Sequence, residues 1–248
     1  MTKPNLMPTK KPAKAPKTTD GAKRFSLVPA AAQQEMYEAI SRLKRAKAGA
    51  VSGAEIAEIA VCVALGERDP VIPVYAARGA RTVRKGGKLV GRNSSKLAAA
   101  TISAAAALLA DAKATALVCA GKLEAEPKAQ EDFRSAFRFA ARHKLPILYL
   151  VANTLAPGRK QELDLRPLHA DFGIPIFSVD ANDAIAAYRV ATEALHNARH
   201  QRGPCVIEAL TLLGKDGCPP HSPEEGGYGP PALELLRSYM ERHGNWAR

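Results

Sequence analysis

Short apolar runs alternate with longer amphipathic segments through most of this chain, and this alternation limits its fold more than any other feature. Residues 146–152, Pro-Ile-Leu-Tyr-Leu-Val-Ala, form the clearest apolar run. Such a continuous run is typical of a strand that is buried on both faces. The segment before it, residues 129–143, carries Phe133, Phe137 and Ala140 at helical spacing. Repeated strand–helix–strand order of this kind predicts an α/β fold with a mostly parallel sheet and helices on both faces.

The same two patterns place the other elements. Apolar runs predict further strands at residues 71–75, 115–119, 174–179 and 204–211. Amphipathic spacing predicts further helices at residues 33–47, 53–65, 163–172, 183–200 and 232–242.

Cap residues set the expected helix starts. Ser52 and Glu55 match a capping box at the start of the helix at 53–65. Asn182 and Asp183 are the expected caps of the helix at 183–200, and Ser94 or Ser95 is that of an Ala-rich helix ending near residue 110. The basic, glycine-bearing residues 78–92 before it are expected to form an exposed loop or a broken helix.

Residues 1–24 differ in character from the rest of the chain. Seven Lys and Arg residues against Asp20 alone give this segment a charge of +6, half of the net charge of +12. Its few apolar groups cannot offset the entropy lost on ordering, so we predict a disordered basic tail at 1–24 and one folded domain at 25–248. A polybasic tail can attract an acidic partner or nucleic acid, or only keep the protein in solution. Because no stacking-aromatic or helix-turn-helix signature accompanies the charge, nucleic acid is not expected as the main ligand.

The compartment follows from the apolar runs and the cysteines. No apolar run is long enough to cross a bilayer, and no apolar stretch behind the basic start resembles a secretory signal, so no membrane association is expected. Cys62, Cys119, Cys205 and Cys218 form no C-x-x-C pair, and no His or Cys lies beside them at ligand spacing. Buried free thiols are typical of a reducing compartment, so a cytoplasmic protein is expected.

The carboxyl ends of the predicted strands are where a ligand should bind in a parallel sheet. These ends are residues 121–122, residues 153–154, Asp180 and residues 214–217.

Several segments match known patterns in a fixed order. Residues 139–153 match NFAA-x-x-KLPV-x-FV-x-x-NN, residues 172–183 match YGIP…VDGND, and residues 203–211 match GPTLIEALTYR. Residues 53–56 and 69–75 match GQEA and DYVFPTYR, and residues 235–246 match a closing helix. Together they resemble the alpha subunit of the thiamine-diphosphate-dependent 2-oxo acid dehydrogenases, the first component of the pyruvate and branched-chain complexes. The resemblance spans nearly all of residues 35–246 and implies the thiamine-diphosphate-binding fold.

The resemblance also implies a magnesium site, and here the chain departs from the family. The family's G-D-G motif falls on Gly121 and Lys122, so a Lys stands where the family has a metal-ligating Asp. The family's Asn pair falls on Asn153 and Thr154, so one Asn of the pair remains. Magnesium prefers hard oxygen ligands and bridges the two phosphates of the cofactor, so a cation at this position predicts no metal site.

The positions implied for the cofactor phosphates also differ. The family's Tyr-Arg pair, which helps hold the phosphates, falls on Tyr75 and Ala76. The family's G-H-G-I-V-G stretch falls on residues 88–93, and its G-H-S loop falls on residues 214–217. His221 follows four positions later and is the candidate for the lost loop histidine.

Two charged residues have open interpretations. Lys122 could occupy the metal position and pair with Asp180, Glu124 or Glu126, or it could bind the phosphate of a different ligand. Glu208 lies inside an apolar strand, so its carboxylate must be hydrogen-bonded or paired across an interface.

Three functions remain possible from the sequence. The lost Asp favours a degenerate alpha-subunit homologue with a scaffold or regulatory role. The alternatives are a working alpha-type subunit with altered cofactor contacts and an unrelated α/β domain that binds a small ligand. Because the family's cofactor site forms between subunits, and because the Ala-rich helix suits close packing, we expect a homodimer or a heteromer with a beta-type subunit.

Overall fold

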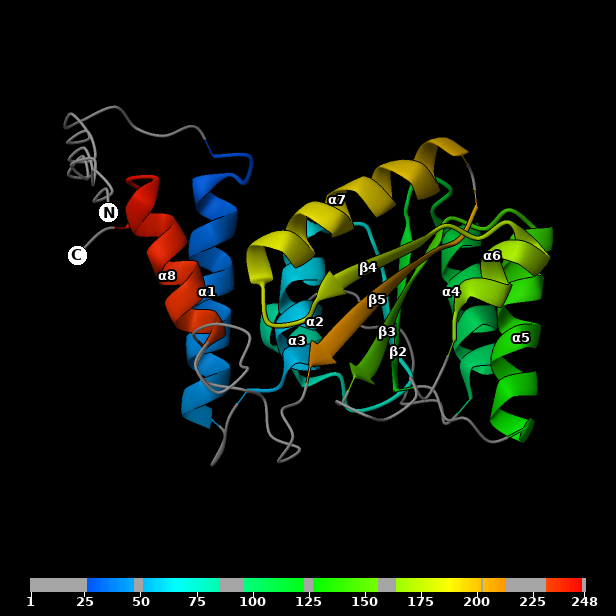
Figure 1. Ribbon diagram of the computed structural model, residues 1–248. Coiled ribbons are helices and arrows are strands. Elements are labelled where there is room, and N and C mark those ends of the chain that lie inside the picture. Colours follow the sequence, from blue (N-terminus) through cyan, green and yellow to red (C-terminus); the bar gives the residue numbers. More distant parts are fainter. Residues whose placement is uncertain are drawn as a thin grey trace, which may run out of the picture.

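A parallel five-stranded sheet forms the centre of the computed structural model, which describes residues 26–46, 51–84, 96–122, 127–155, 164–201, 203–212 and 231–246. The strands lie in the order β1-β2-β3-β5-β4, and every neighbouring pair is parallel (Figure 1). The predicted α/β class with a parallel sheet is confirmed. Their bounds are β1 (Val71–Pro73), β2 (Ala116–Lys122), β3 (Ile147–Leu155), β4 (Ile176–Asp180) and β5 (Cys205–Leu212).

Helices cover both faces of this sheet. One face packs against α2 (Gly53–Ala64) and α7 (Ala184–Gln201). On the same side, further from the sheet, α1 (Ala30–Ala46), α3 (Arg78–Val83) and α8 (Ala232–Arg242) pack against these helices and one another. The other face packs against α4 (Leu97–Ala110), α5 (Pro127–Arg142) and α6 (Arg166–Phe172). None of the helices in the described ranges is long and apolar enough to cross a membrane.

The handedness of parallel connections explains this distribution. β1, β2 and β3 follow one another in one direction across the sheet, so right-handed crossovers place α4 and α5 on the same side. From β3 the chain passes through α6 to the edge strand β4 and returns through α7 to β5. The reversed direction of this last step places α7 on the opposite side.

Alternate side chains of each strand enter two separate cores. In β3, Leu148 and Leu150 enter the core beneath α2 and α7, whereas Tyr149 and Val151 enter the core beneath α4 and α5. Tyr149 is fully buried, and its hydroxyl lies 3.0 Å from the hydroxyl of Thr101 in α4. Burial on both faces is why the apolar run in β3 shows no polar alternation.

The helix caps were predicted only in part. The capping box at α2 is confirmed, because Glu55 N–H donates to Ser52 Oγ and Ser52 N–H donates to Glu55 Oε2. Of the two expected caps of α7, Asp183 is confirmed, because its Oδ1 accepts from Ala186 N–H at 2.9 Å, whereas Asn182 lies one position before the cap.

The start of α4 also differs from the prediction. Neither Ser94 nor Ser95 is the N-cap, which is Lys96, and no side chain of the cap residue bonds to the helix. Leu97 N–H instead donates to Asp132 Oδ2 in α5 at 2.7 Å. A carboxylate at this end also interacts favourably with the helix dipole, so α5 supplies the cap that the local sequence lacks.

The cysteine prediction can be checked at three positions. Cys62, Cys119 and Cys205 are buried free thiols, as expected. Cys218 lies outside the described residues, as does the basic tail at 1–24.

Candidate functional site

The predicted cofactor positions lie together at the carboxyl edge of the sheet. Tyr75 follows β1, Gly121 and Lys122 end β2, and Asn153 and Thr154 lie near the end of β3. These strands are neighbours, since Pro73 pairs with Cys119 and Gly121 pairs with Val151. The described positions that the sequence singles out therefore lie in one contiguous region of the fold. His221 and the loop at 214–217 lie outside the described residues.

Tyr75 points its hydroxyl into the protein rather than toward this edge. The hydroxyl donates to Glu58 Oε1 in α2. Its ring lies against Gly121, where a Cβ atom would be 2.7 Å from Tyr75 Cδ1 and where φ is +68°. Both the close approach of the Tyr75 ring and the left-handed backbone require glycine at position 121. A larger residue there would displace the ring.

Glu58 is the centre of a buried polar cluster. Its side chain is fully buried, and its Oε2 accepts from the N–H groups of Gly79 at 2.8 Å and Ala80 at 3.3 Å, at the start of α3. Burial raises the pKa of this carboxyl, while the hydrogen bonds from Tyr75 and the two amides act in the opposite direction. Burial and the neighbouring carboxylate raise the pKa of Tyr75. The tyrosine therefore stays protonated as a donor to Glu58.

Asn153 is also held by neighbours inside the fold. Its Nδ2 donates to Glu208 Oε1 at 2.7 Å, and its Oδ1 accepts from Thr154 N–H at 2.9 Å. Ser178 on β4 donates to the other oxygen of Glu208 at 2.6 Å. The prediction that the Glu208 carboxylate is hydrogen-bonded is confirmed, and its partners lie on the two neighbouring strands of the same chain.

Lys122 is exposed at the end of β2. The suggested pairing with Asp180 is wrong, because β3 and β5 lie between their strands. Three strand intervals of about 4.8 Å separate them by roughly 14 Å. Glu124 and Glu126, the other suggested partners, lie outside the described residues.

These side chains do not fit a magnesium-bound diphosphate. Such a group needs oxygen ligands that can turn toward the metal. The Tyr75 hydroxyl is directed to Glu58, the Asn153 carboxamide oxygen accepts from a backbone N–H, and Lys122 adds a positive charge. Across the described ranges, no three His, Cys, Asp or Glu side chains form a group that could hold a metal ion.

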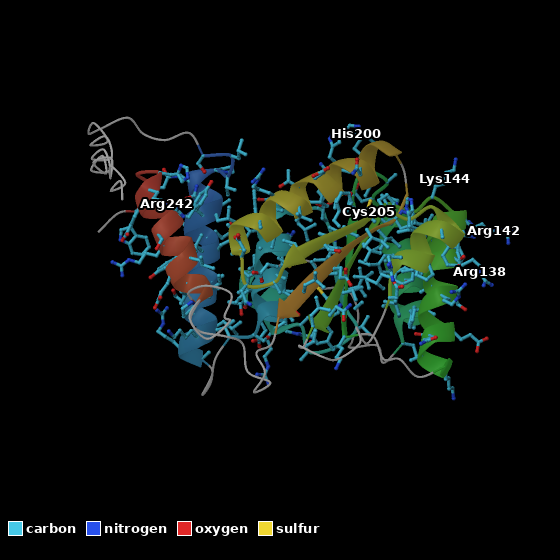
Figure 2. The ribbon with its side chains drawn as sticks, viewed as in Figure 1. Arg138, Arg142, Lys144, His200, Cys205 and Arg242 are labelled. Carbon is cyan, nitrogen blue, oxygen red and sulfur yellow. The ribbon has the colours of Figure 1, made fainter. Side chains whose placement is uncertain are left out.

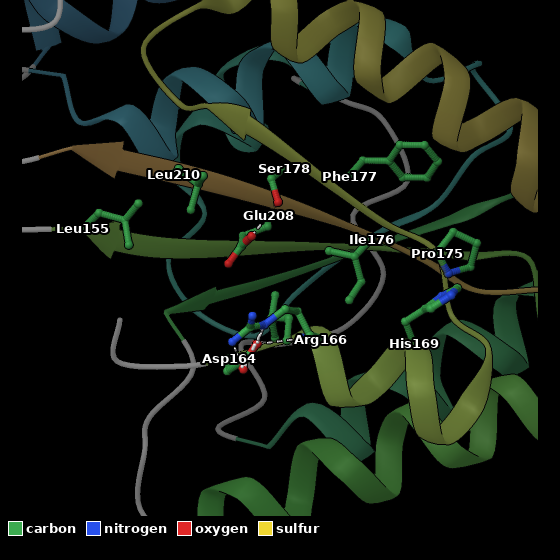
Figure 3. A pocket seen from close by; sticks show the side chains of 11 residues that line it. Leu155, Asp164, Arg166, His169, Pro175, Ile176, Phe177, Ser178, Glu208 and Leu210 are labelled. Carbon is green, nitrogen blue, oxygen red and sulfur yellow. Dashed lines mark hydrogen bonds and ion pairs between the residues drawn. The ribbon is translucent and has the colours of Figure 1, made fainter. Parts of the chain in front are cut away.

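A second concave region lies beyond β3, β5 and β4, on the side of α6 (Figure 3). This cavity of about 790 Å³ has Leu155, Ile176 and Leu210 among its apolar walls and Glu208 and Ser178 among its polar groups. β3 and β5 are neighbours, but the chain continues from β3 to α6 on one side of the sheet and from β5 to α8 on the other. Such a pair of strands marks a topological switch point, and α/β sheets commonly bind ligands there.

Sequence reasoning did not identify this cavity. His169 lies at this cavity, and its Nδ1 lies 3.2 Å from the carbonyl oxygen of Ile174. Ser178 was not singled out at all. Predicting this cavity requires the strand order. A serine within an apolar strand does not by itself show whether its side chain faces a helix or a cavity.

Comparisons with known proteins agree with the resemblance seen in the sequence. The pyruvate dehydrogenase E1 component subunit alpha of Rhizobium meliloti (strain 1021) is 35% identical over 88 residues, covering 33% of this chain and 25% of that protein. The 2-oxoisovalerate dehydrogenase subunit alpha of Bacillus subtilis (strain 168) is 30% identical over 102 residues, covering 39% of this chain and 30% of that protein. The matches thus span a minor part of these relatives.

Among solved structures, the comparison matches part of this chain to the thiamine diphosphate-dependent 4-hydroxybenzoylformate decarboxylase of Rhodococcus jostii RHA1. It has a TM-score of 0.46 and 15% identity, and the match covers 68% of this chain and 35% of that one.

The family model described as the dehydrogenase E1 component matches residues 73–212. This range is more than half of the chain and contains all five strands except the first two residues of β1. The chain therefore belongs to the dehydrogenase E1 component family.

Proposed function

We propose that this protein is a degenerate alpha-type subunit of a 2-oxo acid dehydrogenase first component, with a scaffold or regulatory role in place of catalysis. The alpha-subunit relatives supply the ancestry, and the side chains at the strand ends argue against retained cofactor chemistry. A working alpha-type subunit with altered cofactor contacts is the alternative.

One observation carries this proposal. The side chains that would face the cofactor phosphates and the metal are directed to partners within the fold, Tyr75 to Glu58 and Asn153 to Thr154 and Glu208. Freeing Tyr75 would leave the buried Glu58 carboxylate without one of its three donors, which is costly. Lys122 adds a cation where the resemblance implies a metal-ligating Asp. The cofactor would therefore have to break a buried cluster to gain a site with unfavourable charge.

The partner belongs to the same proposal. The relatives are named as alpha subunits, which supports assembly of this chain with a beta-type subunit or with itself. The Ala-rich helix α4 buries Ala100, Thr101 and Ala104 inward and leaves Ile102 and Leu109 exposed outward. An exposed face of this composition is typical of a helix that contacts another subunit.

An activity assay tests the proposal. The chain is co-purified with a beta-type subunit from the same source, and decarboxylation of pyruvate and 2-oxoisovalerate is followed with thiamine diphosphate and magnesium in excess. We expect no cofactor-dependent release of carbon dioxide. Activity that requires both the cofactor and this chain would contradict degeneracy and favour the working subunit.

A restored variant makes a negative result informative. The triple variant Ala76→Arg, Lys122→Asp, Thr154→Asn carries at these three positions the residues that the resemblance implies. Cofactor binding by this variant, with none by the natural chain, would assign the loss to these positions. Failure of the natural complex to form would be detected separately by light scattering.

A further inference from the structure

The last turns of α7 carry two histidines whose rings are in contact. His196 and His200 are four positions apart on this helix, so their side chains lie on the same side of it, one turn apart. Their ring centroids are 4.2 Å apart, and the ring planes are inclined at 42°. Both residues are exposed, and Figure 2 shows His200 near the end of α7, on the side away from the sheet. We name these two residues the α7 histidine pair.

The same spacing brings other rings together, but with different chemistry. The ring centroids of Phe139 and His143 on α5 are 4.6 Å apart, and those of Tyr239 and His243 at the end of α8 are 4.2 Å apart. In each of these contacts an imidazole meets a ring that is a poor metal ligand. Among the ring contacts within the described ranges, that on α7 alone joins two imidazoles. Imidazole is the commonest metal ligand among side chains, so only this contact offers two ligands to one ion.

The distance between the rings suits a shared metal ion. At a metal–nitrogen distance of about 2.0–2.1 Å, two nitrogens of one coordination sphere are about 3–3.4 Å apart. The two rings, with centroids 4.2 Å apart, are already in contact, so small side-chain rotations can bring one nitrogen of each to this separation. Two histidines at this spacing on one face of a helix also hold the metal of the H-E-x-x-H zinc sites.

The charged neighbours of the pair favour a bound cation. Arg199 lies between the two histidines in sequence, but its guanidinium turns away from them. Its Nη2 donates to the buried Asp69 at 2.6 Å, and its Nε donates to Thr115 Oγ1 at 3.1 Å. Glu193 is exposed one turn before the pair, on the same side of α7. Its carboxylate attracts a cation and can accept a hydrogen bond from a water molecule that the metal binds.

We propose that the α7 histidine pair binds one divalent transition-metal ion. No group of three His, Cys, Asp or Glu side chains in the described part of the chain could hold a metal, so the pair supplies two ligands and water supplies the others. Imidazole suits Zn²⁺, Ni²⁺ and Cu²⁺, whereas Mg²⁺ and Ca²⁺ prefer oxygen ligands. The chemistry of the pair therefore selects the transition metals.

This site is separate from the candidate cofactor region. α7 ends at Gln201 and β5 begins at Cys205, so the pair lies near the amino end of β5. The cofactor positions lie at the opposite edge of the sheet, at the carboxyl ends of the strands. The inference therefore does not rest on the proposed function.

Titration calorimetry with Zn²⁺ or Ni²⁺ and the full-length protein tests the proposal. We expect one ion to bind per chain with a Kd in the micromolar range, and Mg²⁺ to give no heat of binding. His196→Ala and His200→Ala should each weaken the affinity by about tenfold or more, because the second imidazole binds the ion at a high effective concentration. His143→Ala is the matched control, since it also removes one exposed imidazole with a ring contact. Its affinity should stay within about twofold of the natural protein.

A shifted pair tests whether the spacing creates the site. Thr192 is exposed four positions before His196, so Thr192→His with His200→Ala moves the pair one turn along α7. This variant should recover most of the affinity that His200→Ala loses. Three results would overturn the proposal: no binding by the natural protein, binding that survives His196→Ala and His200→Ala unchanged, or no recovery in the shifted pair. Circular dichroism shows that each variant is folded.

Discussion

At the scale of single residues, the fold uses polar groups near the strand ends for its own cohesion. Glu58 connects α2 to the start of α3 through two backbone N–H groups and to Tyr75 through its hydroxyl. Glu208 connects β5 to β3 and β4 through Asn153 and Ser178. Each carboxylate is buried and satisfied, and an unsatisfied one would cost about 1–3 kcal/mol or more. Evolution of a ligand site at either cluster would thus compete with stability.

The contact between Tyr75 and Gly121 gives the first prediction. Gly121→Ala adds a Cβ atom 2.7 Å from the ring and forces an alanine to φ of +68°, so we expect a loss of about 2–4 kcal/mol in the free energy of unfolding. Gly173→Ala is the matched control, because its φ is also +68° but nothing lies within 4 Å of the added atom. It should cost only about 1 kcal/mol. Urea unfolding measures both, and equal losses would show that the ring contact is unimportant.

Glu58 gives a prediction about pH. Its pKa is raised in the folded protein, so the folded state holds this proton more tightly than the unfolded state does. Its contribution to stability is therefore full below the ordinary carboxyl pKa and is lost as the pH rises through the folded-state value. Gln does not titrate, so Glu58→Gln should destabilise most at low pH, by about 1–3 kcal/mol, and less as the pH rises. Urea unfolding of both proteins at several pH values checks this, and a gap that widens with pH would refute it.

At the scale of helices and strands, the local spacing of apolar residues predicted the positions of most elements. The helix α8 and the α2 capping box were predicted correctly because side-chain periodicity and caps act over a few residues. Interactions between distant elements were not predictable in this way. The α4 cap comes from Asp132, 35 positions along the chain, and the local serines gave a wrong answer.

This cap can be tested directly. Asp132→Ala removes the acceptor of Leu97 N–H and should lower the free energy of unfolding by about 1 kcal/mol. Glu131→Ala, at the adjacent exposed position, is the control and should change stability by less than about 0.5 kcal/mol. Thermal unfolding followed by circular dichroism compares them. An equal shift in both variants would mean that Asp132 acts through overall charge rather than as a cap.

At the scale of the whole molecule, the sequence was sufficient for the fold class and for the prediction that the chosen strand-end residues lie near one another. Tyr75, Lys122 and Asn153 do meet at one edge because parallel strands place their carboxyl ends together. Strand order was the information that the sequence lacked. It separates Lys122 from Asp180 by two intervening strands, and it opens the cavity beside Ser178 and His169. The direction of the Tyr75 hydroxyl likewise depends on α2 packing beneath it, which no local pattern encodes.

Loss of cofactor binding is the central claim, and titration calorimetry tests it most directly. Thiamine diphosphate is titrated into the natural full-length chain with and without magnesium, and alongside the variant Ala76→Arg, Lys122→Asp, Thr154→Asn. The natural chain should show no magnesium-dependent heat of binding, because Lys122 opposes the metal and because Tyr75 and Asn153 are held by partners in the fold. A magnesium-dependent Kd in the micromolar range or tighter for the natural chain would contradict the claim.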